Sequence, residues 1–369
     1  MSRKQLFQSG TLGELILKNR FILAPMTRIS ATVTGDVNPM MTEYYKGFAR
    51  GGFGALITEG VYTDRAFSQG YKGQPGITDS SQQESWKKLI HDVKSEDTKI
   101  IMQLMHAGAL SQFNKFSSET CGPSAVLPKG EQMAFYHGHG GYARPKEMTR
   151  EEIKAAISGF VEAAQRAQDA GVDGIEIHSA NGYLLDQFLT DYTNLREDEY
   201  GGNVISRVRL TCEIIERVRE KVGKAFTLGV RTSQAKVNDF DHKWQGQIDD
   251  AKIIFTSLAK AGASYIHTTE LLATAAAFNS GNAVASTSLA GLARKYSDLP
   301  VIANGGLNSP DEAVEMIKTD QAQFVAIGKG ALAAPDLPNK IQRDEQLPEF
   351  DFAILTPIAD IKKSEINHA

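Results

Sequence analysis

The stretch around which the rest of the chain is organised is Gly174-Ile175-Glu176-Ile177-His178-Ser179-Ala180-Asn181-Gly182-Tyr183. Its short β-rich run predicts a parallel strand that ends at His178 and continues into a donor-rich loop. His178 and Asn181 can both donate hydrogen bonds to one oxygen atom, and Tyr183 can supply a proton to a neighbouring atom. The alternative is a capped loop with a hydrogen-bonded histidine, and this stretch alone does not choose between the two.

The same pattern, a short apolar strand followed by a helix, recurs along the whole chain. The predicted strands are 20–25, 55–60, 100–104, 174–178, 226–231, 265–269, 300–306 and 324–328. The predicted helices are 43–50, 81–94, 149–170, 206–221, 248–261, 283–296 and 310–318, with a closing helix from Lys329. Thr149 and Glu152 form a capping box, and Ser309 is a candidate cap. Eight strands that alternate with helices predict an α/β fold, the (β/α)₈ TIM barrel.

Regular alternation lapses from about residue 106 to residue 148, which are rich in Gly, Pro, Ser and His. The segment is too long for an ordinary connection, so we expect an excursion, a lid or hairpin over the barrel mouth after the third strand. His137 and His139 lie in it without a further ligand at useful spacing, and no metal site is predicted. Because composition shows no break, residues 1–369 are expected to form a single domain.

The totals limit the partners of the protein. A formal net charge of −4 gives no reason to expect nucleic acid or an anionic membrane. Cys121 and Cys212 lack zinc or iron–sulfur spacing and indicate a reducing compartment. The N-terminal residues lack the apolar core of a signal peptide, and no apolar run reaches membrane-spanning length. A cytoplasmic protein, monomer or homodimer, is expected.

Functional residues of TIM barrels lie at the C-terminal ends of the strands. Gly305 and Gly306 follow the seventh predicted strand, and Gly328 and Lys329 follow the eighth. Exposed backbone N–H groups and a lysine at these two ends predict a phosphate site.

Other strand ends suit a flat heteroaromatic ring. Gln103 can both donate and accept, as a uracil-like edge requires, and Thr27 offers a hydroxyl group. Arg231 places a positive charge where a reduced ring develops negative charge. A phosphate at one end and a pyrimidine-like edge at the other predict non-covalent FMN.

With these segments in place, the sequence strongly resembles the Old Yellow Enzyme family of FMN-dependent ene-reductases. The matching segments are 17–28, 57–60, 103–106, 122–125, 174–188, 194–202 and 335–338, in family order over nearly the whole chain. The resemblance implies a barrel that holds FMN, is reduced by NADPH or NADH and is reoxidised by an activated alkene such as an enone or enal.

The resemblance also implies roles for individual residues. His178 and Asn181 would hold the substrate carbonyl oxygen, and Tyr183 would protonate the α carbon as hydride reaches the β carbon. The implied FMN contacts are Pro25, Met26, Thr27, Gly60, Gln103, Arg231, Gly305, Gly306, Gly328 and Lys329.

The chain departs from the family pattern at several positions. Lys329 stands in place of an arginine that grips the phosphate, which removes a bidentate contact. Met105 replaces an aromatic residue and should widen the pocket above the ring. Ala109 replaces a frequent arginine, and Ala334 replaces an asparagine. Threonine rather than cysteine at position 27 points to the branch without a redox-tuning thiol.

Alternatives remain at this level. The same flavin chemistry could reduce nitro compounds or nitrate esters, and a flavin-binding barrel could act as a sensor or carrier without turnover. An aldolase would need a lysine for a Schiff base at a strand end, and lysine stands only at the phosphate position. Arg144 is a candidate for binding the 2′-phosphate that distinguishes NADPH from NADH.

Overall fold

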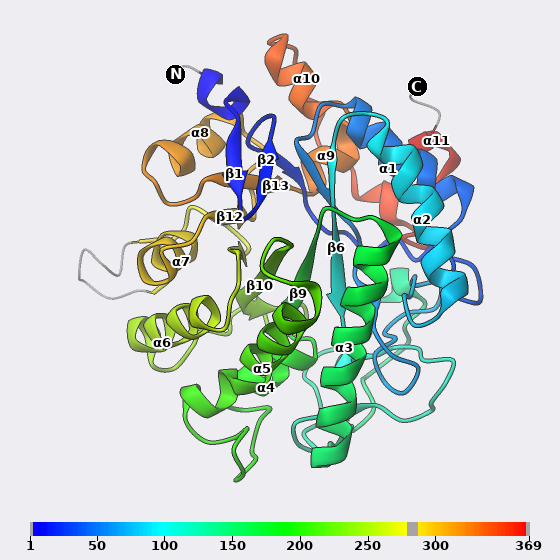
Figure 1. The fold of residues 1–369 in the computed structure, drawn as a ribbon, viewed down its shortest axis with the longest axis vertical. Helices are drawn as coiled ribbons and strands as arrows, with labels where there is room; N and C mark the ends of the chain where they lie inside the picture. Colours follow the sequence, from blue (N-terminus) through cyan, green and yellow to red (C-terminus); the bar gives the residue numbers. More distant parts are fainter. Residues whose placement is uncertain (1–2, 279–286, 367–369) are drawn as a thin grey trace.

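A computed structural model describes residues 3–278 and 287–366 of the chain. Eight parallel strands follow one another around a closed barrel, in which the last pairs with the first (Figure 1). They are β3 (Phe21–Leu23), β4 (Ala55–Ile57), β6 (Lys99–Met105), β9 (Gly174–Asn181), β10 (Thr227–Lys236), β11 (Tyr265–Thr269), β12 (Val301–Asn304) and β13 (Phe324–Ile327). The predicted (β/α)₈ barrel is confirmed.

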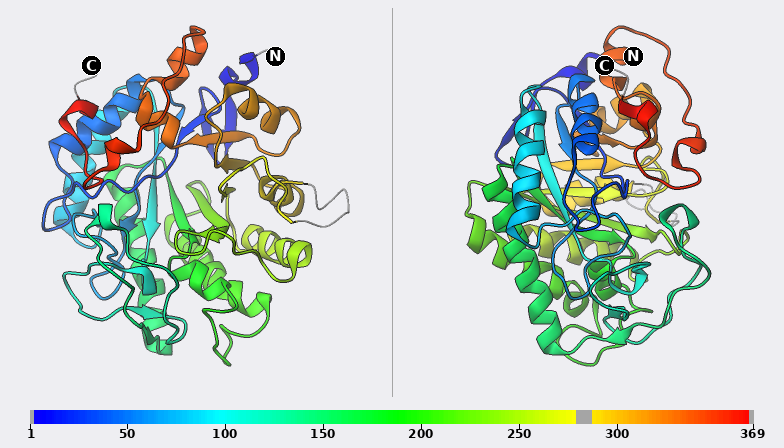
Figure 2. Two further views of the ribbon diagram at one scale, coloured as in Figure 1. Left: turned by 180° about the vertical axis from the view of Figure 1, so that it is seen from behind. Right: turned by 90° about the vertical axis from the view of Figure 1, so that its right-hand side faces the viewer.

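Helices form the outer layer, with α1, α2, α3, α5, α6 and α7 lying side by side in chain order (Figures 1 and 2). The outer helices are α1 (Pro39–Arg50), α2 (Ser80–Lys94), α3 (Arg150–Ala170), α5 (Val204–Val222), α6 (Gln247–Lys260), α7 (Leu289–Ser297) and α8 (Pro310–Lys318). The predicted capping box begins α3: Thr149 Oγ1 accepts from the Glu152 N–H, and Glu152 Oε2 accepts from the Thr149 N–H. Within residues 3–278 and 287–366, no helix is both long and apolar enough to cross a bilayer.

Several element boundaries differ from the prediction. Strands β9 and β10 extend beyond His178 and Arg231, because Asn181 pairs with Lys236 across a register shift. Helix α1 begins at Pro39, where the Asn38 side chain accepts from the Met41 N–H. Ser309 stands at the N-cap of α8 without a side-chain hydrogen bond. Helix α7 begins at Leu289, later than predicted, and residues 283–286 of the predicted helix lie outside the described residues.

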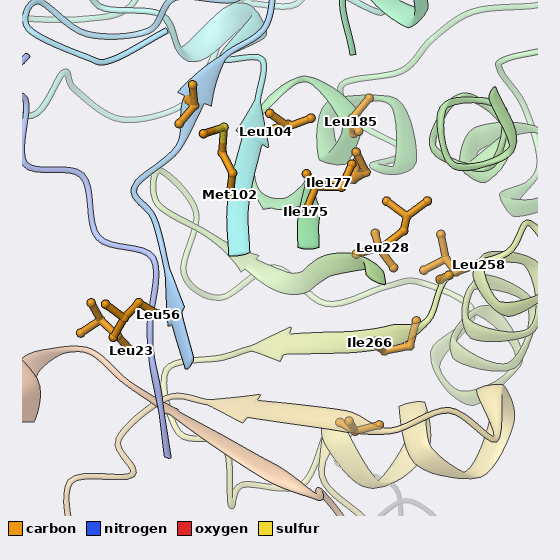
Figure 3. Close-up of a cluster of buried hydrophobic side chains, with 14 of the residues drawn as sticks. Leu23, Leu56, Met102, Leu104, Ile175, Ile177, Leu185, Leu228, Leu258 and Ile266 are labelled. Carbon is orange, nitrogen blue, oxygen red and sulfur yellow. The ribbon is translucent and has the colours of Figure 1, made fainter. Parts of the chain in front are cut away.

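Barrel residues alternate between two cores, as the two-residue period of a strand requires. Side chains on the outer face pack against the helices, among them Leu23, Leu56, Met102 and Ile266 (Figure 3). The inner face carries a separate buried cluster that includes Ile22, Ile57, Ile101, Ile302 and Phe324. A parallel barrel covered by helices therefore buries both faces of each strand.

An N-terminal hairpin that the sequence analysis did not predict closes the barrel floor. Strands β1 (Gly10–Leu12) and β2 (Leu15–Leu17) pair antiparallel after the short helix η1 (Arg3–Phe7). Leu12 and Leu17 are fully buried and join the inner cluster. The turn lies at the N-terminal ends of the strands, since a Cβ at Gly13 would contact Thr227 and Ser264. The opposite end of the barrel is thus left for a site.

The remaining short elements lie on the connections. They are β5 (Val61–Tyr62), η2 (Gly108–Leu110), β7 (Cys121–Gly122), η3 (Ala134–Tyr136), β8 (Lys146–Glu147), α4 (Leu184–Leu189), α9 (Lys329–Ala333), α10 (Leu337–Gln342), η4 (Phe352–Leu355) and α11 (Lys363–Ile366). The C-terminal segment is fastened by Arg28, which is fully buried. Arg28 Nε donates to the Ala359 carbonyl at 3.1 Å and Nη2 to the Asp360 carbonyl at 2.8 Å, and its guanidinium pairs with the Glu365 carboxylate.

We predict that Leu12→Ala destabilises the protein by about 2–5 kcal/mol, because it opens a cavity in the inner core that the barrel floor cannot refill. Ile16→Ala is the matched control, since Ile16 lies in the same hairpin and is 72% exposed. Its effect should stay within about 0.5 kcal/mol. Denaturant midpoints of the two variants measure the difference, and equal midpoints would contradict the role of the hairpin as a packed floor.

Candidate active site

A cavity of about 710 Å³ opens at the C-terminal ends of the barrel strands. That volume lies within the range of small-molecule and cofactor sites. Every predicted site residue except Gly60 lines it: Pro25, Met26, Thr27, Gln103, His178, Asn181, Tyr183, Arg231, Gly305, Gly306, Gly328 and Lys329. The closed barrel brings together residues that lie about three hundred positions apart in the chain.

Gly60 lies behind this lining. Its carbonyl oxygen accepts a hydrogen bond of 2.7 Å from Gln74 Nε2. A Cβ at Gly60 would stand 2.4 Å from Met105 Sδ, so the Met105 side chain fills the space beside it. The backbone contact between Gly60 and FMN that the resemblance implies stays a prediction.

His178 is a buried imidazole that faces the cavity as a neutral group. Burial lowers its pKa well below 6.5, and the positive charge of Arg231 and the neighbouring His267 lower it further. Its Nδ1 atom is buried and has no hydrogen-bond partner among the described residues. A neutral imidazole has one N–H group, so His178 can give one hydrogen bond to a ligand oxygen.

Asn181 reaches the same space from a left-handed backbone conformation, with φ of 62°. Asparagine tolerates this conformation better than most residues. Its N–H donates to Ser233 Oγ at 2.8 Å, and its carbonyl accepts from the Val237 N–H at 3.2 Å. The Asn181 side chain lines the cavity, and its amide makes no hydrogen bond within the described residues, so it is left for a ligand.

Tyr183 is a protonated phenol at neutral pH. Burial raises its pKa, and this effect outweighs the lowering by a hydrogen bond from Tyr71 and by the charge of Arg231. The two hydroxyl oxygens of Tyr183 and Tyr71 are 2.6 Å apart. The Tyr183 ring centroid lies 5.1 Å from that of His178, so a phenol stands beside an imidazole at the cavity.

Arg231 is a cation that lines the cavity. Its Nη2 donates to Asn304 Oδ1 at 2.8 Å and to Thr269 Oγ1 at 3.1 Å. Burial lowers the pKa of Arg231 to about 10, which still leaves the group charged at pH 7. Its Nε is buried without a partner in the part of the chain that the structure describes. A hydrogen-bond acceptor on a ligand would satisfy this group, which otherwise costs free energy.

A buried anion that the sequence did not predict, Glu176, lies beneath the cavity. Glu176 accepts hydrogen bonds from Gln103 Nε2 at 2.8 Å, Tyr265 O–H at 3.0 Å and His267 Nδ1 at 2.9 Å. Burial alone would raise the pKa of Glu176, but His267, Arg231 and Gln103 together bring it below the usual value. The carboxylate is therefore ionised and balances the charge of Arg231.

This anion changes what Gln103 can offer. The sequence predicted an amide that both donates to and accepts from a heterocyclic edge. One N–H of Gln103 is instead committed to Glu176, because a carboxylate can only accept. The Oε1 atom and the second N–H are left for the cavity.

The opposite end of the cavity has the features of an anion site. Gly305 and Gly306 have φ of 132° and 69°, and a Cβ at Gly305 would stand 2.0 Å from the Glu270 carbonyl oxygen. Only glycine gives this bare, left-handed backbone. Gly328 is the N-cap of α9, and Lys329 begins the helix and forms no ion pair within the described residues. The bare glycine backbone and the Lys329 cation suit the phosphate of FMN, and the unpaired Arg231 Nε suits an acceptor on its ring.

Aromatic residues form a wall of the cavity that the sequence analysis did not identify. Met133, Phe135 and Tyr136 come from the excursion, as expected for a lid. Phe350, Phe352 and Leu355 come from the C-terminal segment. The Phe135 and Phe352 rings meet edge to face, with centroids 5.8 Å apart. The close spacing of Phe350 and Phe352 was the only signal in the sequence.

The excursion histidines take no part in a metal cluster. No group of three or more potential metal ligands occurs in residues 3–278 and 287–366. His137 ends the short helix η3 in a left-handed conformation, with φ of 64°.

Residues 5–348 match the sequence model of a family described as "NADH:flavin oxidoreductase / NADH oxidase family". The chain belongs to this family. The resemblance to the Old Yellow Enzyme family is thereby confirmed, and family membership implies FMN as cofactor and a reduced nicotinamide as its reductant. The wall formed by Phe350, Phe352 and Leu355 lies beyond the matched residues.

Known members of the family agree with the fold. An NADH oxidase of Thermoanaerobacter brockii is 32% identical over 92% of this chain, but the match covers 51% of that relative. The chain spans about half the length of the first curated relatives that it matches. The structure of an old yellow enzyme homologue from Zymomonas mobilis superposes with a TM-score of 0.86 at 27% identity, and covers 99% of each chain. Morphinone reductase in complex with tetrahydroNAD gives a TM-score of 0.82 at 27% identity, over 95% of this chain and 93% of that one.

We predict that the His178 imidazole does not titrate near pH 6.5, the ordinary histidine pKa, because burial and Arg231 lower its pKa well below that value. The measurement is an NMR titration of histidine Cε1–H resonances, with the His178→Asn variant used to assign the signal. A midpoint near the ordinary histidine value would contradict the neutral state.

A second prediction concerns the phosphate end. Lys329→Ala should weaken FMN binding by about 10- to 100-fold, because a hydrogen bond to a charged group contributes about 1.5–3 kcal/mol. Riboflavin, which lacks the phosphate, is the control ligand, and its affinity should not change. Fluorescence titration of the apoprotein measures both. An equal loss for the two ligands would show that Lys329 does not contact the phosphate.

Proposed function

We propose that this protein is an FMN-dependent oxidoreductase that uses NADPH or NADH to reduce the carbon–carbon double bond of α,β-unsaturated carbonyl compounds. The observation that carries the proposal is that His178, Asn181 and Tyr183 line the same cavity as Lys329 and the glycines beside it. Support for the nicotinamide comes from the names of the relatives, one an NADH oxidase and one solved with tetrahydroNAD.

The Asn181 amide and the His178 imidazole are suited to donate hydrogen bonds to the carbonyl oxygen of the substrate. Negative charge develops on that oxygen as hydride arrives at the β carbon. Donors aimed at such an oxygen typically contribute about 2.7–4 kcal/mol each in a site that excludes water. Because His178 is neutral, it supplies its N–H without itself becoming the acid. That leaves Tyr183 as the proton source.

Tyr183 suits this step because its raised pKa keeps it protonated until the α carbon becomes basic. Reduced FMN, when bound, supplies the hydride. Gly305, Gly306, Gly328 and Lys329 would hold its phosphate, and Arg231 would stabilise negative charge on its ring.

The apolar and aromatic side chains around the cavity mouth suit bulky apolar substrates. Met133, Phe135 and Tyr136 of the lid line the cavity together with Phe350 and Phe352, and the rings of Phe135 and Phe352 are in contact. Such a lining excludes water and orients a flat alkene over a ring, which lowers the entropic part of the barrier. Reduction of nitro compounds or nitrate esters is the second candidate, because the same two donors can hold a nitro oxygen.

The visible absorbance spectrum of the purified protein tests the proposal. We expect a yellow protein that bleaches anaerobically on addition of NADPH and recovers its colour with 2-cyclohexenone. Recovery with a nitro compound but not with the enone would favour the second candidate. Bleaching without recovery by either would indicate a flavin-binding barrel without this turnover.

Tyr183→Phe separates the two half-reactions. It should leave flavin reduction by NADPH intact and slow reoxidation by 2-cyclohexenone about 10²–10⁴-fold, the usual contribution of a general acid. Anaerobic stopped-flow absorbance measures both rates. Equal slowing of the two would contradict a role confined to protonation.

A further inference from the structure

Tyr71 is a buried residue that the proposed mechanism does not yet use. It lies on the loop after β5, and its side chain is fully buried beside Tyr183, Met105 and Leu110. The 2.6 Å hydrogen bond between its hydroxyl and that of Tyr183 is the only one its hydroxyl makes within the described residues. Because the buried Tyr71 hydroxyl has one partner, the surroundings of the two hydroxyl groups determine which oxygen donates the hydrogen bond.

Two arrangements of the protons are possible. If Tyr183 donated to Tyr71, the Tyr71 proton would be left buried without an acceptor, which is costly. If Tyr71 donates to Tyr183, that cost disappears, because the Tyr183 proton can turn towards the cavity that its residue lines. The second arrangement is therefore favoured, and it points the Tyr183 O–H at the substrate.

The surrounding contacts hold Tyr71 in this position. Its ring packs on Tyr136, with centroids 4.8 Å apart. The Tyr136 hydroxyl donates to the Thr27 carbonyl at 3.1 Å, which ties this pair to the strand end that carries Thr27. The Tyr71 carbonyl accepts from Gln69 Nε2 at 3.3 Å. Tyr71 is thus fixed from its backbone and from its ring face.

We propose that Tyr71 is a positioning residue for proton transfer: its hydroxyl donates to the Tyr183 oxygen, aims the Tyr183 proton at the cavity and stabilises the phenolate that remains. The inference rests on the proposed function. In the step, the Tyr183 O–H bond breaks as a C–H bond forms at the α carbon, while hydride from reduced FMN completes the reduction at the β carbon. The Tyr183 phenolate keeps the hydrogen bond from Tyr71 and is reprotonated by water.

The test is Tyr71→Phe, which removes one oxygen atom and keeps the ring that packs on Tyr136. Loss of a hydrogen bond to a developing charge should lower the rate of flavin reoxidation by 2-cyclohexenone about 10- to 100-fold. Reduction by NADPH, the KM for the enone and the melting temperature should change little. The solvent deuterium isotope effect on reoxidation should increase, since protonation becomes more limiting.

Tyr142→Phe is the matched control. Tyr142 is buried in the same cluster as Tyr71 and Tyr183, and it has no hydrogen bond to Tyr183. The same chemical change there should leave the reoxidation rate and its isotope effect as in the unmodified protein. A loss equal to that of Tyr71→Phe would overturn the inference in favour of a general packing effect.

A double-mutant cycle gives the decisive readout. If Tyr71 acts through the Tyr183 oxygen, Tyr71→Phe should cause no further slowing in a Tyr183→Phe background. An additive loss would overturn the inference. If Tyr183→Phe alone leaves reoxidation unchanged, the proposed proton donor is wrong. If Tyr183→Phe slows reoxidation and Tyr71→Phe does not, only the role of Tyr71 is wrong.

Discussion

The pairing of β13 with β3 is the interaction on which the rest of the structure depends. Val325, Ala326 and Ile327 lie opposite Phe21, Ile22 and Leu23, and this register closes the parallel sheet into a barrel. Closure places the C-terminal ends of all eight strands around one opening. Gly328 then lies beside Met26, with only 3.5 Å between a Cβ at Gly328 and Met26 Sδ. Residues at the ends of the first and the last barrel strand thereby line the same cavity.

Closure also creates an electrostatic constraint. A barrel interior that holds the Arg231 cation away from water must compensate it, because an isolated buried charge is very costly. Glu176 provides the compensation, and His267, the charge of Arg231 and the hydrogen bond from Gln103 together keep it ionised despite its burial. Burial keeps His178 neutral, and the charge of Arg231 beside it disfavours a second cation further. The charge state of each of these groups is therefore set by its burial together with its charged neighbours.

The walls of the cavity come from segments that are not part of the barrel. The excursion contributes Phe135 and Tyr136, and the C-terminal segment contributes Phe350 and Phe352. Arg28 fixes that segment by binding two of its carbonyls and Glu365 from the position next to Thr27. This contact joins the C-terminal segment to the loop after β3, whose residues Pro25, Met26 and Thr27 line the cavity. Differences in substrate range within the family are expected to arise from these connections.

The sequence by itself determined the barrel and the strand-end residues that line the cavity. Short apolar strands that alternate with capped helices leave little choice of fold, and the strand ends then place Thr27, Gln103, His178 and Arg231 at one opening. Only the tertiary structure decided the rest: the hairpin that closes the N-terminal end of the barrel, the anion at Glu176 beneath the cavity, the wall at Phe352 and the hydrogen bond between Tyr71 and Tyr183. Each of these depends on contacts between residues far apart in the chain, which local period and spacing do not encode. Tyr71 and Tyr183 are separated by 112 positions, and only the closed barrel brings their hydroxyls together.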